Sequence, residues 1–455
     1  MTNRDRLLRG CDLHVHMKGA FYPEDVWELG RPVYQDVDWE MLGYLTDYER
    51  VFGVKPDPKG AFARAIEKPG DISLIREYHV FTEKDGGDFT RWEVKTKFFD
   101  TFWRYYSFNI PGETGDRALL HLMLRSQGAH GLDYVEFRNG CGVQYLHYWL
   151  GLCAEYFKEV SNSGLTAKHI LSFPRGEQAA WEHYDALQKV FDARPDIIDT
   201  LVGIDFAGAE EGYPPKMLRG FVKHVLAQNR LRPDRAVDVV YHVGESFFDK
   251  SLESAVRWCH EVAEMGVVRI GHGIALGLDP EVALSRRDNA HETESAAERI
   301  DQIDYDLLHA HRLRQYRVMV NEDQLNAEKE KLQYVDPAHP VRIEYTTERI
   351  DEIRRRQKFA MDRFKELGTV IECCPSSNIR IGGIPREDHP IKCFLENGLR
   401  VVICSDDPGK FDIDVSQEVD LVMQLTGMSE DDLIGRLGDP RQFRLAAHRV
   451  KPGSP

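Results

Sequence analysis

Residues 11–16, CDLHVH, form a short, largely apolar run that contains two histidines, His14 and His16. Residues two apart in an extended strand point to the same face, so both imidazoles can reach one ion from the end of one strand. The run therefore predicts a strand with a metal site at its carboxyl end.

Seven further apolar, often β-branched runs follow, and segments with a helical period separate most of them. They lie at 132–137, 169–173, 201–206, 237–243, 267–270, 369–373 and 400–404. Continuous apolarity is typical of strands that are buried on both faces, as in a parallel sheet. Eight such strands alternating with helices predict an α/β fold, a (β/α)8 barrel of the TIM type.

Polar clusters follow three of the later runs. They are His242-Val243-Gly244-Glu245, Gly271-His272-Gly273 and Ser405-Asp406-Asp407-Pro408. Barrel enzymes place their chemistry at the carboxyl ends of the strands, where these clusters would meet the two histidines of the first run. Adding His242 and Asp406 gives three nitrogen ligands and one oxygen ligand. Such a set leaves room for a water molecule whose pKa the metal lowers.

Two connections are too long for simple crossovers. Residues 20–130 are rich in aromatic residues and are expected to form helices over the barrel mouth, where they would also wall a substrate pocket. Residues 274–367 are strongly charged and include a predicted helix at 347–367. Charged helices usually expose a solvated face, and a dedicated partner surface is the less favoured interpretation. We therefore predict one catalytic domain over residues 1–455 that carries two helical insertions.

The composition excludes several classes of function. The chain has 455 residues, with 59 Lys and Arg against 75 Asp and Glu, and its formal charge is -16. An acidic protein is a poor general binder of nucleic acid or of anionic membranes. The sequence has no apolar run of transmembrane length and no secretory signal at its start, so a cytoplasmic location is expected. The 8 cysteines include no Cys-x-x-Cys pair and are expected to be reduced core residues.

A second His-x-His pattern occurs at His309-Ala310-His311. Residues 303–320 have the pattern of a helix, and residues two apart on a helix do not share a face. We therefore expect no metal site from this pair.

The ordered motifs resemble the adenosine deaminase family of metal-dependent aminohydrolases. The resemblance runs from Asp12 to the helix after Pro408 and is interrupted by the charged insertion. The remaining motifs that carry it are Tyr134-Val135-Glu136-Phe137-Arg138, Gly203-Ile204-Asp205-Phe206-Ala207-Gly208, Arg269-Ile270-Gly271-His272-Gly273 and Cys374-Pro375-Ser376-Ser377-Asn378. Each motif alone is weak, whereas the ordered set is specific.

The resemblance implies one zinc ion per subunit, with ligands at His14, His16, His242 and Asp406. Asp406 is also one of the implied catalytic residues. The strand that ends at 203–208 carries no lysine that could bridge two metals, which also favours a single ion.

The resemblance also implies catalytic and substrate-binding roles. His272 would orient the nucleophilic water, accept its proton or stabilise developing charge, and Glu245 would protonate N1 of a purine. Asp407 would bind N7, the backbone N–H of Gly208 would bind N3, and His16 would also border the substrate.

The implied reaction is hydrolytic deamination of adenosine or deoxyadenosine to inosine or deoxyinosine and ammonia. A close alternative is a 5'-phosphorylated adenine nucleotide (dAMP, AMP or ATP), the substrate of some relatives in prokaryotic antiphage systems. Lys18 replaces a usually acidic family residue, and Lys18 and Arg175 could both face a phosphate. A structural ion pair is an equally favoured role for Lys18.

Other residues are expected to support the site. Glu136 and Arg138 would form an ion pair, and Asp205 would support a ligand or the fold. Ser376 and Asn378 would hold the turn after the seventh strand. Expected partners are water and a small purine, with neither nucleic acid nor membrane. The charged insertion could build a homo-oligomer. A non-catalytic assembly subunit is disfavoured, because the chain keeps every ligand and the proton donor.

Overall fold

Eight parallel strands form the centre of the computed structural model, which describes residues 7–285 and 291–446. In their order around the sheet they are β1 (Cys11–His16), β2 (Tyr134–Asn139), β3 (Thr166–Ser172), β4 (Leu201–Asp205), β5 (Asp238–Val243), β6 (Arg269–His272), β9 (Val370–Cys373) and β10 (Arg400–Ile403). The predicted (β/α)8 barrel is confirmed, and each of the eight expected runs contains or overlaps one of these strands.

The barrel closes through residues of the expected metal site. The N–H of His16 donates to the carbonyl oxygen of Asp406 at 2.8 Å, and the N–H of Asp406 donates to the carbonyl oxygen of His14 at 2.9 Å. These bonds form a parallel bridge between Val15 and Asp406 that joins the two outermost strands. The backbone that closes the ring therefore also fixes the spacing of three of the four expected ligands.

Helices cover the outside of the barrel and enclose its apolar core. They are α7 (Leu146–Ser161), α8 (Glu177–Ala193), α9 (Arg219–Leu231), α10 (Leu252–Glu264), α15 (Thr347–Leu367), α17 (Ile391–Glu396), α19 (Val415–Thr426) and α20 (Glu430–Leu437). Strand side chains such as Ile204, Tyr241 and Ile371 pack in this layer with helix residues such as Phe221. Within the described residues, no helix is both long and apolar enough to cross a bilayer.

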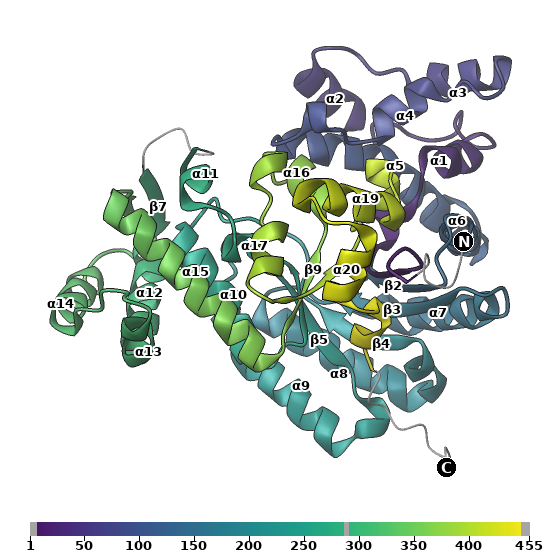
Figure 1. Ribbon diagram of the computed structural model, residues 1–455. Helices are drawn as coiled ribbons and strands as arrows, with labels where there is room; N and C mark the ends of the chain where they lie inside the picture. Colours follow the sequence, from purple (N-terminus) through teal and green to yellow (C-terminus); the bar gives the residue numbers. More distant parts are fainter. Residues whose placement is uncertain (1–6, 286–290, 447–455) are drawn as a thin grey trace.

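The first long connection folds into α1 (Pro23–Gly30), α2 (Tyr44–Phe52), α3 (Pro58–Glu67), α4 (Ser73–His79), α5 (Phe89–Asn109) and α6 (Thr114–Ala129). Figure 1 shows α1 to α4 gathered at one end of the molecule, beside α5. Their aromatic side chains form a core of their own, in which the ring of Trp39 stacks on Phe98 at 5.2 Å and meets the ring of Phe102 at 4.8 Å. The aromatic run of α5 thus serves mainly as packing for this helical lobe.

The second long connection contains a two-stranded antiparallel sheet that the sequence pattern did not predict. This insertion consists of α11 (Pro280–Ser285), β7 (His291–Ser295), α12 (Ala296–Leu308), α13 (Ala310–Gln315), α14 (Glu322–Leu332) and β8 (Pro340–Glu344). Figure 1 shows α12 to α14 standing out from one side of the barrel. Helix α15 follows and packs along α10. It therefore belongs to the outer layer of the barrel, although the expected insertion at 274–367 included it.

The remaining short helices, α16 (Pro375–Arg380) and α18 (Pro408–Phe411), follow β9 and β10 directly. Cys373 and Cys374 lie buried where β9 meets α16. Burial raises the pKa of both thiols, which agrees with the expectation of inert core cysteines.

Buried ion pairs join strands across the interior of the barrel. Arg269 donates from Nε to Oε1 of Glu372 at 2.6 Å and from Nη2 to Oε2 of Glu136 at 2.5 Å. Arg138 pairs with the other oxygen of Glu372 and, at 3.2 Å, with Asp205. The expected pair between Glu136 and Arg138 was therefore wrong. The two side chains leave the same face of β2, and each pairs with residues of other strands.

Glu372 is the centre of this network, and removing its charge should destabilise the protein. Burial raises the pKa of Glu372, but Arg138, Arg269 and His14 together hold it well below its usual value. We expect Glu372→Gln to lower the free energy of unfolding by about 3–5 kcal/mol, because two buried arginines lose their common partner. Urea unfolding followed by circular dichroism measures the change.

The matched control is Glu396→Gln, at an exposed carboxylate 4.0 Å from Lys392. This variant should unfold within about 0.5 kcal/mol of the unaltered protein. Equal stability of the two variants would contradict a structural role for the interior network.

Candidate active site

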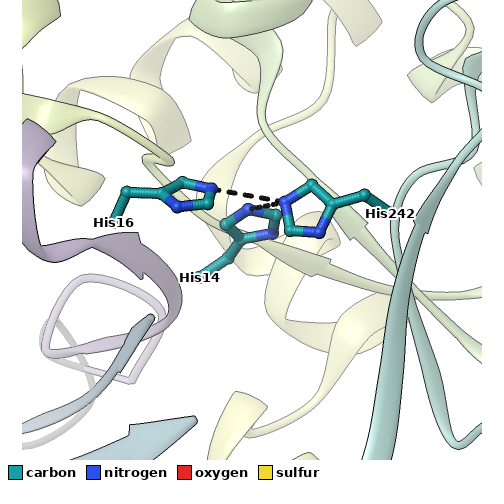
Figure 2. Close-up of side chains that lie close together, drawn as sticks. All are labelled: His14, His16 and His242. Atoms are coloured by element: carbon teal, nitrogen blue, oxygen red, sulfur yellow. Dashed lines mark hydrogen bonds between the residues drawn. The ribbon is translucent and has the colours of Figure 1, made fainter. Parts of the chain in front are cut away.

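Four side chains meet at the carboxyl end of the barrel. Nε2 of His242 lies 3.0 Å from Nε2 of His14 and 3.3 Å from Nε2 of His16. Oδ1 of Asp406 lies 3.3 Å from Nε2 of His14 and 3.2 Å from Nε2 of His16. Figure 2 shows the three imidazoles, which come from β1 and β5, pointing toward one another.

This cluster fits a metal ion better than it fits a set of hydrogen bonds. Oδ1 of Asp406 is buried and has no hydrogen-bond partner. Ligands at about 2.0–2.1 Å from a tetrahedral zinc ion lie roughly 3.4 Å from one another, close to the four separations in the cluster. Three imidazoles and one carboxylate are also a donor set that zinc accepts. The four residues would therefore hold the ion that the sequence predicts.

Carboxylates fix the orientation of two of the imidazoles. Nδ1 of His14 lies 2.9 Å from Oε2 of Glu372, and Nδ1 of His242 lies 3.1 Å from Oδ1 of Asp205. Such contacts place the ring proton on Nδ1 and leave Nε2 free to bind metal. Burial lowers the pKa of His242 to about 4, so this imidazole is neutral at pH 7. Asp205 therefore supports a ligand, one of the two roles expected for it.

His272 and Glu245 lie beside the cluster. Nε2 of His272 is 3.4 Å from Oε2 of Glu245 and 4.0 Å from Oδ2 of Asp406. Burial, with further contributions from neighbouring charges such as that of Asp406, raises the pKa of Glu245 well above its usual value. Burial lowers the pKa of His272. A carboxyl group with a raised pKa and an imidazole with a lowered pKa thus stand next to each other, the arrangement that acid–base catalysis uses.

Two site residues adopt a backbone conformation that residues other than glycine rarely take. The φ angle is 68° at His272 and 64° at Asp406. Residues held in this left-handed region cost free energy and concentrate at functional sites. Both follow or end a strand, where the turn directs their side chains toward the cluster.

Sequence reasoning missed two residues that position the acid and the base. One carboxylate, Glu210, accepts hydrogen bonds from the backbone N–H groups of Gly244, Glu245 and Ser246 at 2.9, 2.9 and 3.1 Å. Asn378 contacts Nδ1 of His272 at 3.0 Å, beyond its expected role in a turn. No local pattern marks Glu210, because it lies in the loop after β4 and acts on the loop after β5.

The expected substrate contacts lie near the cluster. Asp407 follows the ligand Asp406 and packs against Gly19, where a Cβ atom would lie 1.7 Å from its Oδ1. Only glycine at position 19 leaves room for this carboxylate. Burial and the charge of Asp406 raise the pKa of Asp407 to about 7. Gly208 has a φ angle of 81° and follows β4 in a loop that also holds Glu210.

The structure does not support a phosphate contact for Arg175. Its Nη2 donates to the carbonyl oxygens of Gly208 at 3.2 Å and of His242 at 2.9 Å. The guanidinium also lies 5.2 Å from the ring centre of Tyr241 and is almost fully buried. Arg175 thus ties together two backbone segments of the site through Nη2.

Lys18 takes part in the ion pair that was one of its two expected roles. Its Nζ lies 3.1 Å from Oδ1 of Asp100, and both side chains are partly exposed. The pair borders a cavity of about 800 Å³, whose wall includes Trp103, Arg104 and Tyr148. Lys18 follows His16 by two residues, but none of the four cluster residues lines this cavity.

Comparisons with known proteins agree with this site. The model of the adenosine deaminase family matches residues 152–297 and 338–437, more than half of the chain. An adenosine deaminase from Escherichia coli (strain SE11) is 24% identical over 94% of this chain and 91% of its own length. An adenine deaminase from Rhizobium leguminosarum bv. trifolii is 34% identical over 22% of this chain and 30% of its own length.

Solved structures share the fold. The N6-methyl-AMP deaminase from Arabidopsis thaliana superposes with a TM-score of 0.53 at 12% identity, covering 98% of this chain and 94% of its own. A zinc-bound amidohydrolase from Burkholderia ambifaria gives a TM-score of 0.54 at 13% identity, covering 98% of this chain and 87% of its own.

The barrel, the ligand cluster and the family match define a metal-dependent deaminase. The chain belongs to the adenosine deaminase family.

The contact between Asp205 and His242 should contribute to metal affinity. We expect Asp205→Asn to weaken zinc binding at the cluster by about 10- to 100-fold, because His242 loses the carboxylate that orients it. Competition with a chromogenic chelator measures the affinity. The control Asp196→Asn changes a carboxylate that pairs only near the surface, with Arg194 and Lys158. An unchanged affinity in Asp205→Asn would show that the contact is only structural.

Proposed function

We propose that the protein is a zinc-dependent deaminase that converts adenosine or deoxyadenosine and water to inosine or deoxyinosine and ammonia. The observation that carries the proposal is the convergence of His14, His16, His242 and Asp406 beside the carboxyl group of Glu245, whose pKa burial raises. Family membership supplies the purine class, and the E. coli relative is named adenosine deaminase. One zinc ion at the active site follows from the four ligands that surround one point there.

Each residue of the site has its own role in the reaction. Bound zinc supplies acidification of a water molecule, which makes it a nucleophile at neutral pH. His272 is neutral and accepts a proton from that water as it adds to C6 of the purine. Glu245 delivers its proton to N1, because addition at C6 breaks the aromatic ring. His272 passes the proton that it accepted to the amino group, which leaves C6 as ammonia. The C6 hydroxyl loses its proton to Glu245, and the product carries a 6-oxo group.

Other residues orient the purine. Asp407 is set to face N7, since its pKa of about 7 allows the protonated carboxyl group to donate a hydrogen bond. The backbone of Gly208 is set to face N3, and Arg175 fixes that segment through the Gly208 carbonyl oxygen. His16 is the most exposed of the three ligand imidazoles and borders the same space. These contacts select a purine over a pyrimidine.

A 5'-phosphorylated substrate is the second candidate, and the cavity at Lys18 is the observation that favours it. Lys18 and Arg104 both line this cavity, and the Arabidopsis neighbour is an N6-methyl-AMP deaminase. Three carboxylates, Asp100, Glu113 and Asp116, line the same cavity, and one of them already pairs with Lys18. A phosphate would meet this negative charge, so the nucleoside is the better fit. A role in antiphage defence would accompany the nucleotide substrate.

A substrate panel tests the proposal. Ammonia release and loss of adenine absorbance are measured for adenosine, deoxyadenosine, dAMP, AMP and ATP. We expect the highest kcat/KM on a nucleoside and little effect of Lys18→Ala on it. Preference for a 5'-phosphate, lost in Lys18→Ala while nucleoside turnover is kept, would select the second candidate.

Glu245→Gln tests the role of the acid within the same panel. We expect kcat to fall by about 100- to 10,000-fold while zinc content is unchanged, because the amide cannot deliver a proton to N1. Glu387→Gln, at an exposed position, is the control and should keep full activity. Full activity in Glu245→Gln would show that this residue is not the proton donor. If the unaltered protein deaminates no purine in the panel, the non-catalytic assembly subunit becomes the better interpretation.

A further inference from the structure

A second group of metal-ligating side chains lies outside the barrel, where the charged insertion packs on α10. His260 and Glu264 stand one helical turn apart on α10, and His309 comes from the junction of α12 and α13. One ligand atom of each lies within 4.8 Å of the other two. These residues take no part in the site described above.

A break in the helix brings His309 to this place. Helix α12 ends at Leu308 and α13 begins at Ala310, and His309 between them has φ −102° and ψ 10°. His309 is buried against α10, whereas His311 is exposed. The side chains of His309 and His311 therefore differ in their surroundings. His309 lies beside His260 and Glu264 of another helix.

The two imidazoles have buried nitrogen atoms without a hydrogen-bond partner, Nε2 of His260 and Nε2 of His309. Each faces one oxygen of Glu264, at 3.5 Å for His260 and 3.6 Å for His309. These distances exceed the usual range for an N–H···O bond, about 2.7–3.2 Å. Both Nε2 atoms thus point at the carboxylate of Glu264 but lie too far from it for a hydrogen bond.

The two separations between an imidazole and the carboxylate are close to those of ligands around one ion. Tetrahedral zinc ligands lie roughly 3.4 Å apart, and Nε2 of His16 lies 3.2 Å from Asp406 in the active site. The hydroxyl of Tyr305 contacts Nδ1 of His260 at 2.6 Å. When this nitrogen carries the ring proton, Nε2 presents a lone pair, as in histidines that bind metal.

We propose that His260, Glu264 and His309 bind a divalent transition-metal ion, with zinc as the best match to two imidazoles and one carboxylate. A cavity of about 290 Å³ borders Glu264 and His309 and is also lined by Glu261, Asp301 and Asp304. This cavity admits the ion and a water molecule as its fourth ligand. The ion joins α10 to the insertion.

Charges of both signs surround the three residues. Arg363 competes for Glu264 from 3.9 Å, but it also contacts Glu366. Arg219 and Lys216 also line the cavity, where Lys216 pairs with Asp301, and Asp304 adds a further carboxylate.

Zinc content and anomalous diffraction test the proposal independently of the catalytic function. After incubation with zinc and removal of unbound ions, the unaltered protein should hold two zinc ions per chain. His309→Gln should hold one, and the control His311→Gln should hold two. Crystals of the unaltered protein, measured at the zinc absorption edge, should show an anomalous peak at bonding distance from Nε2 of His260 and Nε2 of His309.

Equal zinc content in the unaltered protein and His309→Gln, or no anomalous peak between α10 and His309, would overturn the proposal. Glu264→Gln, at a partly exposed position, provides a second variant if His309→Gln does not fold, and it should also lose one ion. An anomalous peak at His260 with none at His14 would leave this proposal standing. It would count against the active-site assignment instead.

Discussion

Three imidazole nitrogens and one carboxylate oxygen meet at the carboxyl end of the barrel, with four contacts of 3.0–3.3 Å among them, and a shared cation would satisfy all four atoms. The backbone of the same residues closes the ring of strands, since His14 and His16 exchange hydrogen bonds with Asp406. Barrel closure and ligand spacing are therefore one constraint. Any change that shifts β1 against the end of β10 changes both.

Buried charges extend this constraint into the barrel. Glu372 contacts His14 and both interior arginines, and Asp205 contacts His242 and Arg138. The expected ligands are thus held by a network of buried ion pairs. Its side chains have few alternative positions, because moving one would leave a buried charge unpaired. This rigidity explains how the left-handed backbone at His272 and Asp406 persists. The backbone of Glu245, the proposed acid, is held separately by the carboxylate of Glu210.

The strands and the ligand cluster could be predicted because both depend on local patterns. Apolar runs mark buried strands, and strand ends mark the site of chemistry in a barrel. The partner of Glu136 could not be predicted, since pairing with Arg269 depends on the geometry across the barrel. Glu210 and the backbone contacts of Arg175 were not predicted for a related reason. Each acts through the backbone of a neighbouring loop, and charge patterns along the chain carry no information about that contact.

Ammonia release during zinc restoration is the most direct test of the account. Protein stripped by a chelator is supplied with increasing zinc, and deamination of adenosine and of AMP is followed at each step. The account predicts no turnover in the stripped protein and a rise that saturates as the cluster at His14, His16, His242 and Asp406 fills. Full turnover without metal, or no ammonia from either substrate at any zinc concentration, would contradict it.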